Sequence, residues 1–187
     1  SIQTKLDFLN NRELFSNYYL KNLLPESDEW DRIDGEELEE KFEDIKEIYE
    51  KRKNIIKEHN EHQLRRNFIE PIIEKLGFSP VGEESVKRSG RQPDYALFKE
   101  DEDATEAFEK KGESDFYKNA ISLLEAKKWD RDLDKRGRKR DFTNPSHQVY
   151  VYLQETPVNW AILTNGKQWR IYYSKTSHKL DSYYEID

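Results

Sequence analysis

Two acids and a lysine lie at the ends of apolar stretches, where charged side chains are unusual. Asp94 precedes the apolar residues 95–98, and Glu125 and Lys127 flank Ala126 at the end of a second apolar run. Because side chains alternate between the faces of a strand, Glu125 and Lys127 share one face. If the two strands pair, Asp94, Glu125 and Lys127 converge at one sheet edge. Two carboxylates and an ammonium group there suit one hard divalent cation and one activated water.

The pattern of an acid, any residue and a lysine is not specific by itself. It also occurs at Glu39-Glu40-Lys41 and at Glu109-Lys110-Lys111, where charged surroundings are typical of a solvated face. Only Glu125-Ala126-Lys127 follows an apolar run, and the sole Pro-Asp dipeptide, Pro93-Asp94, lies one strand earlier. Together these half-motifs resemble the PD-(D/E)xK nuclease superfamily. The resemblance implies that Asp94, Glu125 and the carbonyl of Ala126 ligate a metal, and that Lys127 orients or deprotonates the attacking water.

Gln148 and Tyr152 lie four residues apart in an expected helix and therefore on one helical face. The pair resembles the Q-x-x-x-Y motif of the nuclease domain in type I restriction motor subunits, which implies that both residues belong to the active site. An amide and a phenol on one face could bind a phosphate or brace the catalytic strand. The alternative is a core tyrosine beside an ordinary polar residue.

The segment 60–78 resembles the opening helix of nuclease domains in type IIG restriction enzymes. In those enzymes an acid at the position of Glu61 often joins the metal site, whereas by itself Glu61 is a first-turn acid that favours the helix dipole. The resemblance covers residues 60–187. It implies a DNA endonuclease domain that uses Mg²⁺, with Mn²⁺ as a possible substitute. It also implies methyltransferase and target-recognition domains in the full-length protein.

The hydrophobic periodicity predicts an α/β fold, with a mixed central sheet of four or five strands flanked by helices and preceded by an N-terminal helical hairpin. Helices are expected at 4–24, 36–58, 61–76 and 145–155, the last capped by Asn144. Strands are expected at 92–98 and 120–127, at 160–164 and 168–173 around an Asn165-Gly166 turn, and at 182–186. The acidic insert 99–115 predicts an exposed loop or short helix. Residues 1–59 and 60–187 are the expected domains.

Charge is unevenly distributed along the 187 residues, whose formal net charge is -7. Residues 26–50 hold thirteen acids and three bases, whereas residues 127–140 hold eight bases and three acids. A basic stretch directly after the candidate catalytic strand suits a polyanion such as double-stranded DNA, through salt-sensitive backbone contacts. A solvated basic loop is the alternative. The candidate DNA contacts are Lys128, Arg131, Arg136, Arg138, Lys139 and Arg140.

Composition excludes several classes of protein. The chain has no cysteine, which rules out disulfides and thiolate zinc sites and is typical of a cytoplasmic location. It has no apolar run of about 18 residues, so no membrane partner is expected. Two rivals to the type IIG hypothesis stay open. One is a motor-coupled type I nuclease, and the other is an inactive nuclease scaffold that binds proteins through its acidic N-terminal helices.

Overall fold

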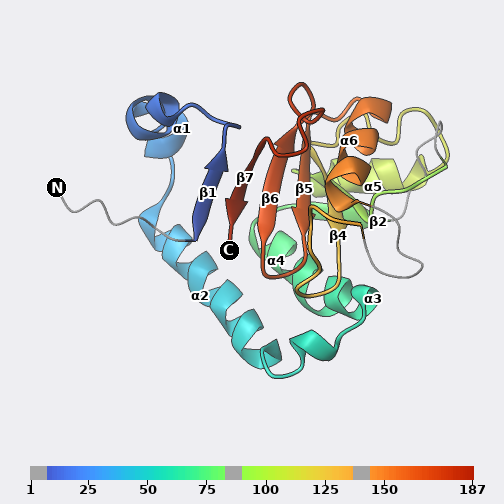
Figure 1. Cartoon of the computed structure of the whole chain (residues 1–187), viewed down its shortest axis with the longest axis horizontal. Coiled ribbons are helices and arrows are strands. Elements are labelled where there is room, and N and C mark those ends of the chain that lie inside the picture. The colour runs from blue at the N-terminus through green and yellow to red at the C-terminus, as the bar shows by residue number, and fades with distance from the viewer. Residues whose placement is uncertain (1–7, 83–89, 137–143) are drawn as a thin grey trace.

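The computed structural model describes residues 8–82, 90–136 and 144–187, and over these residues the chain has an α/β fold with an open, mixed sheet (Figure 1). Its seven described strands follow the order β1-β7-β6-β5-β4-β3-β2, and only β4 and β5 are parallel. The strands are β1 (Leu9–Arg12), β2 (Ser79–Gly82), β3 (Tyr95–Phe98), β4 (Ser122–Ala126), β5 (Trp160–Thr164), β6 (Trp169–Tyr173) and β7 (Tyr183–Ile186).

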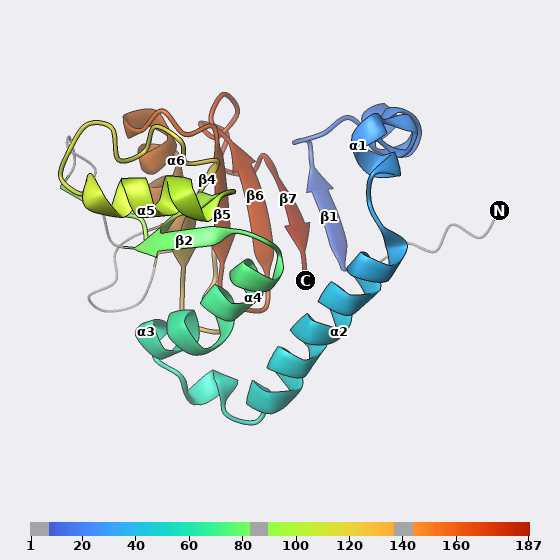
Figure 2. The ribbon, with the colours of Figure 1, turned by 180° about the vertical axis from the view of Figure 1, so that it is seen from behind.

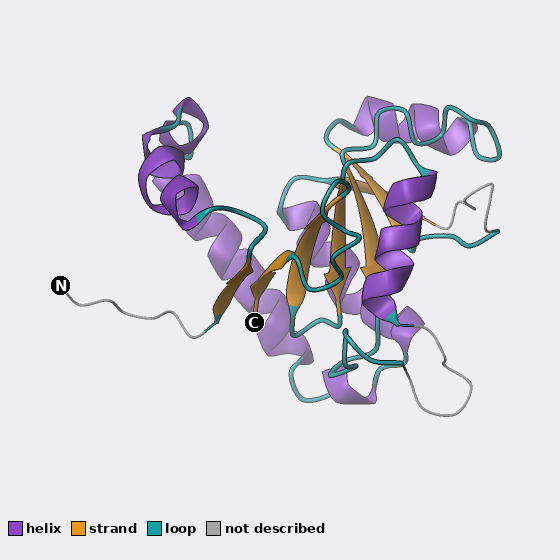
Figure 3. Ribbon diagram, turned by 45° about the horizontal axis from the view of Figure 1, so that its top comes forward, coloured by secondary structure: helices purple, strands orange, loops and turns teal. Residues whose placement is uncertain are grey.

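Six α-helices occur in the described residues, with short π and 3₁₀ segments between some of them. They are α1 (Asp28–Asp31), α2 (Gly35–Arg52), α3 (Glu61–Leu64), α4 (Glu70–Lys75), α5 (Asp101–Glu109) and α6 (Pro145–Glu155). The sheet has a hydrophobic core on each face. The first packs β3–β6 against α5 and α6, and the second packs β3 and β4 against α3 and α4 (Figures 2 and 3). The mixed sheet between helical layers confirms the expected α/β class.

Local sequence signals explain where the site-bearing helices begin. Asn60 and Gln63 form a reciprocal capping box at α3, and the Asn144 side chain accepts a hydrogen bond from Ser146 N at the start of α6. The expected helix 61–76 runs through α3 and α4, joined by a π-helical turn at Arg65–Ile69. Pro71, two residues after the end of this turn, has no N–H for a regular helical hydrogen bond.

The N-terminal segment differs from the prediction. In the described part of residues 4–24, β1 pairs antiparallel with β7, and helical backbone begins at Asn17 and continues through a π turn (Tyr19–Leu23) and a 3₁₀ turn (Leu24–Glu26). The predicted first helix of the hairpin is therefore wrong for residues 9–12, which form a strand, and right for residues 17–24. Helix α2 confirms the second helix. The sheet also has more strands than the four or five expected. The division into domains at residue 59 stays a prediction.

The turn between β5 and β6 contains a glycine that its surroundings require. Asn165 Oδ1 accepts hydrogen bonds from the amides of Lys167 at 3.0 Å and Gln168 at 2.7 Å. Gly166, which lies between Asn165 and Lys167, has a φ of +85°. A Cβ added to it would lie 2.8 Å from Cε3 of Trp129. The turn therefore has neither the backbone angle nor the space for a side chain.

We expect Gly166→Ala to lower the free energy of unfolding by about 2–4 kcal/mol, through left-handed backbone strain and overpacking against Trp129. Gly112→Ala is the matched control, because Gly112 has the same φ of +85° with nothing within 4 Å of an added Cβ. Urea denaturation of both variants measures the difference. Equal losses in the two variants would show that the contact with Trp129 costs nothing.

Candidate active site

Antiparallel pairing of β3 with β4 brings the two half-motifs together. Tyr95 is opposite Leu124, so Asp94, one residue before β3, lies beside the end of β4. The N–H of Ala126 donates to Asp94 Oδ2 at 2.8 Å. In an extended strand the carbonyl of a residue faces the same side as its N–H. The carbonyl of Ala126 is therefore directed toward the Asp94 side of the strand.

Glu125 and Lys127 form an ion pair at the same end of β4. Lys127 Nζ donates to Glu125 Oε1 at 2.7 Å, and both side chains are largely buried. Glu125 Oε2 is buried and has no hydrogen-bond partner in the described part of the chain. A buried carboxylate oxygen without a partner lowers stability, because it has lost its hydrogen bonds to water and makes none with the protein.

The buried carboxylates hold their protons more strongly than free ones. Burial, followed by the nearby charge of Asp94, raises the pKa of Glu125 from 4.5 to about 8 against the opposing effect of Lys127. Burial also raises the pKa of Asp94, although the Arg65 guanidinium opposes it. Burial lowers the pKa of Lys127, but the carboxylates of Glu125, Glu61 and Asp94 together outweigh burial and the net shift is upward. Lys127 is therefore a cation that lies beside two acids, and each acid is more stable as a carboxylate when a positive charge is nearby.

Arg65, in the π-helical turn, is a site residue that sequence reasoning missed. Its guanidinium donates to Asp94 Oδ1, and its other terminal nitrogen lies 3.3 Å from His62 Nδ1. The residue is 8% exposed. The signal available in the sequence was a basic residue directly after Leu64, within an apolar helical stripe. Such a position predicts a buried cation, and a buried cation needs an acid as partner.

Gln148 and Tyr152 do share one face of α6. Gln148 Nε2 donates to Tyr152 Oη at 2.9 Å, and Tyr152 Oη donates to the carbonyl of Gln92 at 2.9 Å. Tyr152 is 1% exposed and braces the segment that leads into Asp94. Burial, followed by the charge of Glu125, raises the pKa of Tyr152, which keeps it a neutral hydrogen-bond donor.

Glu61 lies at the first position of α3 and is exposed. Its charge raises the pKa of Glu125 and of Lys127, which places it within electrostatic range of the carboxylates. No cluster of three or more acidic, histidine or cysteine side chains with the geometry to hold a metal occurs in the part of the chain that the structure describes. Asp94 and Glu125 thus form a two-carboxylate set, and the membership of Glu61 stays a prediction.

The basic stretch begins next to the site but is only partly described. Lys128 and Arg136 are exposed, whereas Arg131 folds back and donates to the carbonyl of Lys135 at 2.8 Å. Arg138, Lys139 and Arg140 lie outside the described residues. Buried Arg170 on β6 anchors the described part of this stretch, because it donates to Asp134 Oδ1 at 2.6 Å. The loop after β4 is thus attached to the sheet.

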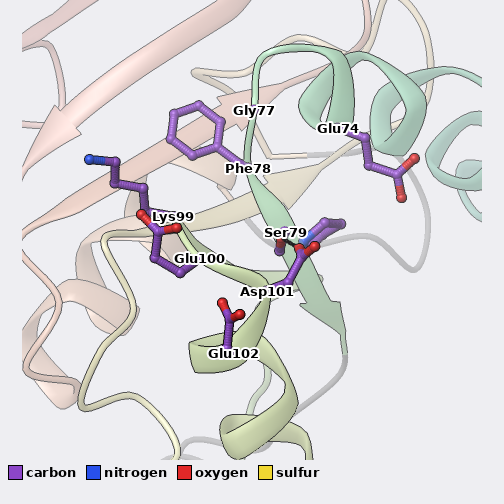
Figure 4. A pocket seen from close by; sticks show the side chains of 9 residues that line it. Glu74, Gly77, Phe78, Ser79, Lys99, Glu100, Asp101 and Glu102 are labelled. Carbon is purple, nitrogen blue, oxygen red and sulfur yellow. Dashed lines mark hydrogen bonds between the residues drawn. The ribbon is translucent and has the colours of Figure 1, made fainter.

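A separate polar hollow of about 610 Å³ lies between β2 and the start of α5 (Figure 4). Glu74, Lys99, Glu100, Asp101 and Glu102 line it together with residues 77–80, and Ser79 Oγ donates to Asp101. It shares no lining residue with the carboxylate site. The carboxylate site at the junction of β3, β4, α3 and α6 is thus separate from this hollow.

Comparison with protein-family models, with curated proteins and with solved structures finds no match to this chain. Among the described residues, no helix combines the length and the apolar character needed to cross a lipid bilayer. The resemblance to nucleases therefore depends on the motif residues and on where the fold places them.

Proposed function

We propose that this chain is the nuclease domain of a restriction enzyme, a Mg²⁺-dependent DNA endonuclease with a restriction-endonuclease-like PD-(D/E)xK site. The supporting observation is Glu125 Oε2, a buried oxygen that has no hydrogen-bond partner among the described residues, at the point where Asp94, Ala126 and Lys127 also meet. A type IIG protein, with methyltransferase and target-recognition domains in the same chain, is the arrangement that the motif residues favour.

These donors fit a hard divalent cation such as Mg²⁺ or Mn²⁺. Asp94 and Glu125 supply carboxylate oxygens, and the Ala126 carbonyl is a third oxygen ligand directed to the same side. Burial disfavours the ionised form of both acids, because it raises the pKa of Asp94 and of Glu125. A nearby cation stabilises the ionised form, and Glu125 Oε2, which has no partner among the described residues, can bind it. When bound between Asp94, Glu125 and the Ala126 carbonyl, such a cation would supply Lewis-acid activation of the attacking water and of the scissile phosphate.

The remaining chemistry belongs to the residues of the chain. Lys127, which its raised pKa keeps as a cation, orients the attacking water and offsets the charge that develops on the phosphate. Tyr152 and Gln148 hold the segment before Asp94 against α6. Lys128, Arg136 and the basic residues beyond them contact the DNA backbone and carry no sequence information. Hydrolysis leaves the 3′ oxygen as the leaving group.

The test is cleavage of supercoiled plasmid by the full chain with Mg²⁺ or Mn²⁺. We expect nicked or linear product with the wild type and none with Glu125→Ala, while Glu113→Ala, which changes an exposed acid, cleaves like the wild type. Cleavage by Glu125→Ala at the wild-type rate would overturn the assignment. Failure of every variant to cleave DNA and to bind Mn²⁺ would favour the inactive-scaffold alternative.

A further inference from the structure

An apolar groove of about 670 Å³ lies on the sheet face that carries α3 and α4, beside α2. Figure 2 shows the ribbons of α2 and α4 on this side of the sheet. Its floor is formed by β5, β6 and β7, and its walls come from α2 on one side and from α4 with the preceding π turn on the other. The side chains that form it are mainly aromatic or branched. They include Phe42 and Tyr49 of α2, Leu76 after α4, and Trp169, Ile171 and Ile186 of the floor.

Helix α2 has a hydrophobic stripe that the described part of the chain covers only in part, through Ile45 and Ile48, which pack against the core. None of its 18 residues is buried, although Phe42, Ile45 and Tyr49 line the groove. Phe42 is 57% exposed, and across the groove Leu76 and Ile186 are 43% and 45% exposed. A contiguous apolar patch rimmed by polar residues is typical of a surface that binds another molecule.

The helix is nevertheless held in a defined place. Lys75 of α4 pairs with Asp44 of α2 at 3.0 Å, and Lys41 Nζ donates to the carbonyl of Lys75 at 3.3 Å. The ring of Tyr49 contacts that of Phe68 at a centroid distance of 6.5 Å. These contacts fix the two helical walls, and the stretch of α2 from Phe42 to Tyr49 corresponds to about two helical turns. Such dimensions suit the apolar face of one short amphipathic helix.

The charge around the groove indicates which charge a helix bound in it should carry. Helix α2 has eight acids and four bases, whereas at the end of the groove Asp187 pairs with Lys167, which also lines the groove. Near Phe42, Glu36, Glu39 and Glu40 form no ion pair with another residue that the structure describes. These exposed acids disfavour binding of a second copy of this chain, because that copy also has a negative net charge, -7. They attract a partner with basic flanks.

We propose that the groove binds an amphipathic helix of a partner protein, with an apolar face flanked by Lys and Arg. The apolar face packs on Phe42, Leu76 and Ile186, and the basic flanks meet the acids of α2. This interaction is separate from the proposed nuclease activity, because the groove contains neither Asp94 nor Glu125.

The test uses two labelled 18-residue peptides with the same Leu stripe, one flanked by Lys and the other by Glu. By fluorescence polarisation with the full chain, we expect saturable binding of the Lys peptide, and binding of the Glu peptide weaker by at least tenfold. Phe42→Gln should weaken binding of the Lys peptide at least tenfold. Ile33→Gln, which changes an apolar residue that is 50% exposed outside the groove, should leave binding within about twofold.

Each contrary result overturns the proposal in its own way. Equal affinity for the two peptides would remove the role of charge, and an unchanged affinity in Phe42→Gln would place binding elsewhere. A concentration-dependent dimer in light scattering that Phe42→Gln disrupts would identify a second copy as the occupant. Binding by Glu125→Ala, which lacks the nuclease site, should equal wild-type binding, so failure of the nuclease assignment and failure of the groove are distinguishable.

Discussion

Replacing Lys127 with glutamine is expected to reduce DNA cleavage by about two to four orders of magnitude, with the fold retained. The amide can still donate to Glu125 Oε1, which in the wild type accepts from Lys127 Nζ at 2.7 Å. The amide carries no charge, so it cannot offset the charge that develops on the phosphate. The loss should therefore appear in the rate of the chemical step.

Metal binding separates this effect from damage to the site. Removing the positive charge of Lys127 favours binding of a cation. Removing the ion pair also raises the pKa of Glu125 further, which opposes binding of a cation. Because the two effects oppose each other, Mn²⁺ affinity should change by less than about tenfold. Calorimetric titration of Mn²⁺ and a plasmid-cleavage assay on the same preparation measure both quantities. Lys118→Gln, at an exposed lysine, is the control. A cleavage rate within tenfold of the wild type would remove Lys127 from the mechanism.

The parts of the fold that the sequence predicts correctly carry strong local signals. Residues 95–98 and 122–126 are apolar runs with acids at their ends, and they form β3 and β4. Asn144, Pro145 and Pro157 mark a helix, and α6 begins and ends between them. The convergence of Asp94, Glu125 and Lys127 follows once those strands pair. The pairing itself was inferred from the family resemblance.

The parts that sequence reasoning missed depend on tertiary contacts. Strand β1 has the sequence LNNR with no buried residue, so its pairing with β7 leaves no hydrophobic alternation to detect. The position of Arg65 in an apolar helical stripe indicates burial, but only the fold shows that Asp94 is its partner. The π-helical turn that aims Arg65 inward is likewise invisible to a 3.6-residue pattern. Long-range partners decide these features, and local periodicity does not contain them.

With divalent cations chelated, we expect the stability of the wild type to fall as the pH rises from about 4.5 to about 8. The folded state raises the pKa of Glu125 from 4.5 to about 8, chiefly through burial. Across that window the native protein retains a proton that the unfolded chain releases, so the slope of unfolding free energy against pH is negative. Stability from this group is complete below the lower pKa and lost above the higher one.

Glu125→Gln should remove this pH dependence, because glutamine stays neutral and can keep the hydrogen bond from Lys127. At pH 8 the variant should be more stable than the chelated wild type by on the order of a few kcal/mol, and near pH 4.5 the two should be similar. Urea denaturation at several pH values measures the difference, with Glu113→Gln as the exposed control. Saturating Mn²⁺ should reverse the ranking at pH 8, because only the wild type offers both carboxylates to a cation. Parallel pH profiles for wild type and Glu125→Gln would mean that Glu125 is ionised in the native state, and the electrostatic case for a cation would then lose its main support.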